Sequence, residues 1–132
     1  MTDSPFGNVE KAKPETDCPG DTPPTELQVE DLEVGTGKEA TEGAQISAHY
    51  VGVAWSTGEE FDASWNRGQP LSFTVGVGQV IQGWDQGLLG MKVGGRRRIV
   101  IPPHLGYGDR GAGAAIKGGE TLIFVVDLVD VR

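Results

Sequence analysis

Large aromatic residues recur along this chain of 132 residues, and five of them stand inside short motifs. The motifs, in order, are His49-Tyr50-Val51-Gly52, Phe61-Asp62-Ala63-Ser64, Val80-Ile81-Gln82-Gly83-Trp84-Asp85, Gly106-Tyr107-Gly108 and Leu122-Ile123-Phe124. No strong nucleophile, metal cluster or phosphate loop accompanies them. If the aromatic rings converge, they form a dry pocket, and the chemistry to expect there is one that desolvation alone accelerates.

The same aromatic residues also have a purely structural explanation, because large aromatic side chains usually fill the core of a small protein. Two features favour a site instead. Asp62 places a carboxylate directly beside Phe61, and Tyr107 stands between glycines in a loop, where a core tyrosine is not required. Both interpretations stay open on these residues alone. Rotation about an X-Pro peptide bond is one reaction that a dry pocket accelerates without a nucleophile.

Other chemistries lack the residues that they need. Gly76-Val77-Gly78 begins like a dinucleotide-binding loop, but Ile81 stands where the third glycine should fall. His49 and His104 have no metal-binding spacing, so we expect no metal and no cofactor. His49 and Tyr50 are neighbours on a predicted strand, so they point to opposite faces, and we expect Tyr50 to face inward.

Length, charge and composition limit the number of domains and the kinds of partner to expect. The length suits one domain, and the net charge of −8 disfavours duplex DNA and anionic membranes as partners. No apolar run reaches a membrane span, so we expect no membrane and a cytoplasmic protein. Residues 1–26 hold five of the eight prolines and few large apolar side chains, which predicts a disordered acidic tail with an isolated thiol at Cys18. No further apolar stripe demands a partner subunit, so we expect a monomer.

Hydrophobic periodicity predicts a curved antiparallel sheet and one short helix. Alternation with a period of two residues indicates strands at 27–34, 46–55, 59–61, 71–75, 97–101 and 121–131. Apolar residues at helical spacing indicate a helix over 81–89. A sheet of five or six strands with one helix on its face is an α+β domain, which we place at 27–132.

The motifs, taken together with Arg67 and Pro70, resemble the FKBP family of peptidyl-prolyl cis-trans isomerases in their order and spacing. The resemblance covers residues 27–132 and is strongest to the bacterial, cytosolic, single-domain form. The family's fold is a half-barrel sheet of five to six strands wrapped around one short helix. That fold agrees with the strands and the helix expected from periodicity.

The resemblance also implies a role for each matching residue. Trp84 would form the pocket floor, and the Ile81 N–H and the Tyr107 hydroxyl would donate to substrate carbonyls. Asp62 would approach the isomerising carbonyl, held by Tyr50 and Arg67. The implied catalytic set is Phe61, Asp62, Trp84, Tyr107 and Phe124. The implied substrate-binding set is Tyr50, Arg67, Leu71, Phe73, Val80, Ile81 and Ile116.

The implied activity is rotation of X-Pro bonds in proline-containing polypeptides, assisting protein folding, with rapamycin-type macrolides as further ligands. Two departures from the family pattern bear on the pocket: Leu71 stands where eukaryotic relatives often have an aromatic wall residue, and the loop 110–119 is rich in small residues. The alternative function is a module that binds proline-containing segments or macrolides, with turnover incidental. A general holdase would need a large exposed apolar surface, which the pattern does not provide.

Overall fold

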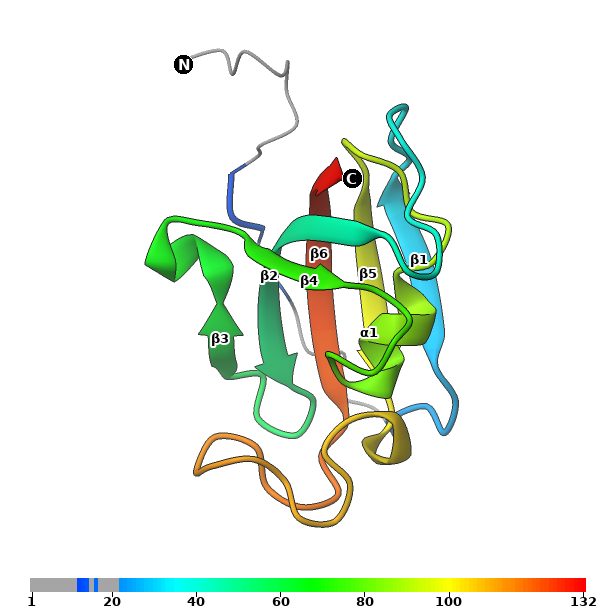
Figure 1. The fold of residues 1–132 in the computed structure, drawn as a ribbon. Coiled ribbons are helices and arrows are strands. Elements are labelled where there is room, and N and C mark those ends of the chain that lie inside the picture. The colour runs from blue at the N-terminus through cyan, green and yellow to red at the C-terminus, as the bar shows by residue number, and fades with distance from the viewer. Residues whose placement is uncertain (1–11, 15, 17–21) are drawn as a thin grey trace.

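The computed structural model describes residues 12–14, 16 and 22–132 (Figure 1). Most of the expected tail at 1–26, including Cys18, lies outside the described residues. Within them, no helix is both long and apolar enough to cross a membrane.

The fold is a six-stranded antiparallel sheet with one short α-helix, which confirms the expected class. The strands are β1 (Gln28–Glu33), β2 (Gln45–Ala54), β3 (Glu60–Ala63), β4 (Leu71–Thr74), β5 (Arg96–Ile101) and β6 (Leu122–Val131). The main path runs β1-β5-β6-β2-β3, and β4 pairs with β2 off this path. The sheet is open and curved rather than closed into a barrel.

The helices are all short. They are α1 (Gln82–Gly87) and two 3-10 helices, η1 (Ser64–Arg67) and η2 (Pro103–Leu105). Periodicity predicted α1 but neither 3-10 helix, because a single turn carries no repeating apolar pattern. The predicted helix was also too long at its end: α1 stops at Gly87, and Leu89 is exposed.

α1 lies against β5 on the inner face of the sheet (Figure 1). Its glycines allow the close approach, since a Cβ atom on Gly83 would come within 2.5 Å of the Ile101 side chain. A helix of 6 residues with two glycines is too short to be stable alone, so packing must hold it. The main core cluster joins Trp84 and Leu88 to the inward residues of β5 and β6.

Arg97 of β5 holds the C-terminal end of α1. Its side chain is buried, and Nη1 donates to the carbonyl oxygens of Gly87 (2.9 Å) and Leu89 (3.0 Å). Asp31 of β1 accepts from Nε of the same guanidinium at 2.7 Å. Carbonyls at a helix end have no partner within the helix and carry partial negative charge, so Arg97 meets both needs.

The outer face of the sheet is also apolar at its centre. Strand alternation places Val51 and Val53 of β2 on this face, and both are buried. They belong to two small clusters that include Val125 and Ile123 of β6. Lys13, with Pro14 and Thr16, lines a hollow over these two valines. Described residues of the N-terminal segment therefore lie against the outer face.

Candidate active site

A hollow of about 440 Å³ opens above the start of α1, on the inner side of the sheet. Strands β2, β3, β4 and β6, the loop before α1 and the loop after η2 all contribute to its wall. The lining residues are Tyr50, Phe61, Asp62, Leu71, Gln79, Val80, Ile81, Trp84, Tyr107 and Phe124. The hollow thus brings together every motif that the sequence singled out.

Trp84 forms the floor of the hollow and is 4% exposed. The Tyr50 and Phe124 rings meet it edge to face, with centroids at 5.0 and 5.2 Å. Phe61 meets Phe124 in the same way at 5.5 Å. Edge-to-face contacts suit the charge distribution of aromatic rings, so the cluster is both apolar and rigid.

The floor carries one polar atom without a partner. Nε1 of Trp84 is buried and has no hydrogen-bond partner among the residues that the structure describes. A buried donor without an acceptor costs free energy, so such atoms are rare in folded proteins.

Gly52 lets the aromatic walls close over β2. A Cβ atom at this position would lie 2.6 Å from atoms of both the Phe61 and Phe124 rings. Real Cβ atoms do not come so close to their neighbours. The glycine of the His49-Tyr50-Val51-Gly52 motif is therefore a packing requirement of the pocket wall.

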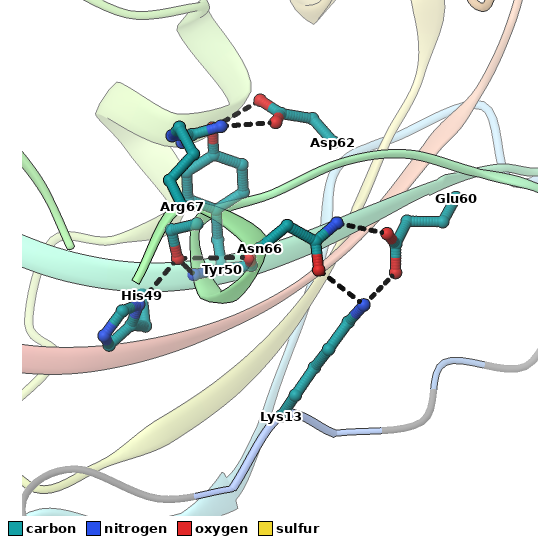
Figure 2. A network of polar contacts seen from close by, with 8 residues as sticks. Lys13, His49, Tyr50, Glu60, Asp62, Asn66 and Arg67 are labelled. Carbon is teal, nitrogen blue, oxygen red and sulfur yellow. Dashed lines mark hydrogen bonds and ion pairs between the residues drawn. The ribbon is translucent and has the colours of Figure 1, made fainter. Parts of the chain in front are cut away.

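Asp62 lies at the edge of the hollow in a closed polar network with Tyr50 and Arg67 (Figure 2). The Tyr50 hydroxyl donates to Oδ2 of Asp62. Arg67 Nη1 donates to Oδ1 of Asp62 at 2.7 Å, and its Nη2 donates to the Tyr50 hydroxyl at 2.8 Å. Each partner therefore bonds to the other two, as a partly buried polar network requires.

The network keeps Asp62 ionised. Partial burial acts to raise the pKa of Asp62, but hydrogen bonds from Tyr50 and Arg67 outweigh it and leave the pKa below its ordinary value. Burial, followed by the hydrogen bond to Asp62, raises the pKa of the Tyr50 phenol. At neutral pH the site therefore holds a carboxylate, a neutral phenol and a guanidinium. None of these is a proton donor or acceptor poised near neutrality.

Contacts on the opposite face of β2 support the Asp62–Tyr50–Arg67 network. The Tyr50 N–H donates to Oγ of Ser64 at 2.7 Å, and this hydroxyl also bonds to Nδ1 of His49 at 2.8 Å. His49 is buried and stacks on Trp65, with centroids 4.8 Å apart. These contacts fix the start of η1 against β2, and η1 carries Arg67. His49 is thus packed on the face opposite Tyr50, as the alternation predicted.

The rim of the hollow is half open. Leu71 and Tyr107 are 37% and 41% exposed, and Val80 and Ile81 are half-buried. The N–H of Ile81 donates to no acceptor within the described part of the chain. Asp85 of α1 shapes this rim by accepting from the N–H groups of Gly76 (2.8 Å) and Gly78 (2.9 Å) in the preceding loop.

Three of the expected site residues do not line the hollow. Arg67 acts through Asp62 and Tyr50. Phe73 packs against Trp84 at 5.6 Å and is buried in the core. Ile116 is 6% exposed and belongs to the same core cluster. Because both apolar side chains are buried, their roles in substrate binding stay predictions.

Gln79 is a lining residue that the sequence analysis missed. Its Oε1 accepts from the N–H of Thr74 at 2.8 Å, which closes the loop between β4 and α1. Its position immediately before Val80 was the only signal for it. Among the described residues, no group of three or more His, Cys, Asp or Glu side chains is placed to hold a metal ion.

Comparisons with known proteins agree with this geometry. Residues 36–129 match the family described as FKBP-type peptidyl-prolyl cis-trans isomerase. An FK506-binding protein of Streptomyces anulatus is 65% identical over 120 residues, which cover 90% of this chain and 97% of the relative. The chloroplastic peptidyl-prolyl cis-trans isomerase FKBP13 of Arabidopsis thaliana is 50% identical over 122 residues, 88% of this chain and 57% of the relative.

A solved structure is similar over the same region. The crystal structure of AtFKBP13 aligns with a TM-score of 0.76 and 44% sequence identity. The alignment covers 83% of this chain and 96% of that chain.

Proposed function

Because this chain belongs to the FKBP-type peptidyl-prolyl cis-trans isomerase family, we propose that its aromatic hollow is the place where X-Pro bonds rotate. The enzyme is a peptidyl-prolyl cis-trans isomerase, and its similarity to the bacterial FK506-binding protein extends over 97% of that relative. The family's ligands are proline-containing substrates and FK506-type macrolides.

Rotation of the X-Pro bond needs no covalent step. The planar amide faces a barrier of about 18–20 kcal/mol, because its resonance is lost in the twisted state. The carbonyl of the twisted amide is less polar than that of the planar one, so a dry pocket disfavours the planar ground state more. Walls of Trp84, Phe61 and Phe124 supply such surroundings. This is differential binding of the transition state.

Polar groups at the edge of the hollow orient the substrate. Asp62 lies on the lining of the hollow. There its carboxylate would approach the carbonyl of the rotating amide. The N–H of Ile81 and the hydroxyl of Tyr107 donate to the flanking carbonyl oxygens. Support for these roles comes from the position of all three groups on the lining of one hollow.

The single observation that carries the proposal is the closed Asp62–Tyr50–Arg67 network beside the Trp84 floor. Its test is kcat/KM for cis-to-trans isomerisation of a short peptide with leucine before proline. We expect Asp62→Ala to lower kcat/KM by about tenfold, equivalent to about 1.4 kcal/mol. A folded Asp62→Ala variant with unchanged kcat/KM would remove Asp62 from the mechanism.

We extend the proposal to the protein's setting. The enzyme acts as a monomer in the cytoplasm and assists the folding of proline-containing polypeptides. FK506 and rapamycin-type macrolides occupy the same hollow, and the names of its relatives support this ligand class. Macrolides should then inhibit isomerisation competitively. A macrolide that binds without inhibiting would place its site elsewhere.

A further inference from the structure

Lys13 contacts two side chains that lie far from it in the sequence. Its Nζ atom lies 2.7 Å from Oε1 of Glu60 and donates to Oδ1 of Asn66 at 3.1 Å (Figure 2). Asn66 Nδ2 donates in turn to Oε2 of Glu60 at 2.9 Å. The three side chains form a closed ring, which we call the Lys13 clamp, and it ties β3 to η1.

The Lys13 clamp joins the same two elements as the Asp62–Arg67 pair. β3 carries both Glu60 and Asp62, and η1 carries both Asn66 and Arg67. The Arg67 and Asp62 side chains are 46% and 41% exposed, so burial alone does not fix their 2.7 Å contact. Exposed ion pairs are weak unless neighbouring contacts restrict them. The Lys13 clamp supplies that restriction from the outer side.

The backbone beside Lys13 is itself attached to the sheet. Arg96 Nη2 donates to the carbonyl oxygen of Ala12 at 2.9 Å. Arg96 is held in place by Asp127, which is 1% exposed and accepts from it at 2.6 and 2.8 Å. The Lys13 ammonium is therefore presented from a fixed point on β5 and β6 rather than from a free chain.

We propose that Lys13 is a positioning residue of the isomerase site, acting through Glu60 and Asn66 to hold Asp62 and Arg67 at their working separation. The proposal rests on the proposed role of Asp62. Residue 13 lies outside the matched region 36–129, so this support for the site comes from beyond the matched domain.

Replacing Lys13 removes a positive charge and also breaks the contacts with Glu60 and Asn66. A test therefore has to separate the effect of the charge from the effect of the lost contacts. The hydrogen bond from Lys13 lowers the pKa of Glu60, while the nearby charge of Asp62 acts to raise it. A lone Lys13 substitution would leave the Glu60 charge facing Asp62. The double variant Lys13→Met/Glu60→Gln removes one charge of each sign and breaks the clamp at constant net charge.

The experiment measures the pKa of the Asp62 carboxyl by NMR titration and kcat/KM on the leucine-proline peptide, in the full chain. In Lys13→Met/Glu60→Gln we expect the pKa of Asp62 to rise and kcat/KM to fall about two- to fivefold. Lys13→Arg should keep both within about twofold of wild type, because it preserves the cation and its donors. Lys38→Ala, an exposed lysine, serves as the matched control and should change neither.

Salt gives an independent readout. Because the Lys13 clamp is half-exposed, its effect should be screened at about 1 M salt. Wild-type kcat/KM should then approach that of the double variant.

The outcomes separate the two proposals. An unchanged pKa of Asp62 in a folded double variant would overturn the positioning role of Lys13, whatever happens to the rate. A raised pKa of Asp62 with a wild-type rate would support the clamp and instead remove Asp62 from the mechanism. Equal losses in Lys38→Ala would also overturn the role of Lys13, because a substitution that leaves the Lys13 clamp intact would then give the same effect.

Discussion

The Tyr50 hydroxyl donates to the Asp62 carboxylate, and Arg67 donates to both of them. One phenol thus links the buried aromatic floor to the charged edge of the hollow. The ring of Tyr50 meets Trp84, while its hydroxyl end fixes Asp62. Changes at either end can therefore be tested separately.

Removing only the hydroxyl tests the charged end. We expect Tyr50→Phe to raise the pKa of Asp62 toward its ordinary value, to lower kcat/KM, and to cost about 1 kcal/mol of unfolding free energy. NMR titration, peptide kinetics and urea unfolding measure the three effects. Tyr107→Phe loses a hydroxyl outside the network, so it should lower kcat/KM without moving the pKa of Asp62. An identical pKa of Asp62 in both variants would contradict the network.

The pH dependence follows from the directions of the pKa shifts. The pKa of Asp62 is lowered in the folded state, so its stabilising contribution is present above about pH 4 and is lost as pH falls through the folded pKa. The pKa of Tyr50 is raised, so its contribution is present below about pH 10 and is lost above the folded pKa. We expect kcat/KM and stability contributed by this network to be flat between about pH 6 and 8. A steep rate profile in that window would show that proton transfer limits the reaction.

Two substitutions of Trp84 separate the ring from its unpartnered N–H. Trp84→Ala empties the floor and should cost about 3–5 kcal/mol of unfolding free energy, with most activity lost. Trp84→Phe removes a buried donor that lacks an acceptor within the described residues, which offsets part of the lost packing. Its unfolding free energy should change by about 1 kcal/mol or less. Thermal or urea unfolding measures both free energies. Equal losses of unfolding free energy in Trp84→Ala and Trp84→Phe would contradict the separation of ring packing from the cost of the unpartnered N–H.

Gly52→Ala tests the close packing of the walls. The added methyl would meet the Phe61 and Phe124 rings, so they must move, at a cost of about 1–3 kcal/mol. We expect lower stability in urea unfolding and a lower kcat/KM. Adding Phe61→Leu should recover part of the stability, because the shorter side chain makes room for the methyl. Strictly additive losses in that double-mutant cycle would refute the direct clash.

The exposed rim predicts a preference for apolar residues before proline. Val80 and Tyr107 line the hollow and offer apolar surface there. A leucine before proline should be favoured over glutamate by about fivefold or more in kcat/KM, because about 1 kcal/mol of transfer free energy is gained. A peptide series that varies only this residue measures it. Equal rates across the series would contradict the prediction.

Periodicity and spacing predicted most of the fold. The alternation around Tyr50 placed β2, and the apolar spacing around Trp84 placed α1, because both patterns repeat along one face. The first strand is present as predicted, and its pairing with β5 has a register shift between Asp31 and Glu33. The motifs and their resemblance to a known family then predicted the residues that line the hollow, except Gln79.

The remaining features depend on contacts between distant segments. Sequence patterns gave no signal for η1, a single turn whose place is set by Ser64 bonding to β2. They gave none for the contact of Lys13 with Asn66, which lies 53 positions away. The boundary between a tail at 1–26 and the domain stays a prediction, since most of the tail lies outside the described residues.

The contact of Arg97 with the end of α1 has a consequence for protein engineering. The floor of the hollow stands on a helix whose stability is supplied by another strand, and that strand's arginine is held by Asp31 at the far edge of the sheet. A graft that transplants the segment around Trp84 into a new scaffold would carry the binding residues of α1. It would leave behind Arg97, the residue that caps the C-terminal end of that helix. The transferable module is therefore the helix together with β5 and β1, although these strands contribute no side chain to the hollow.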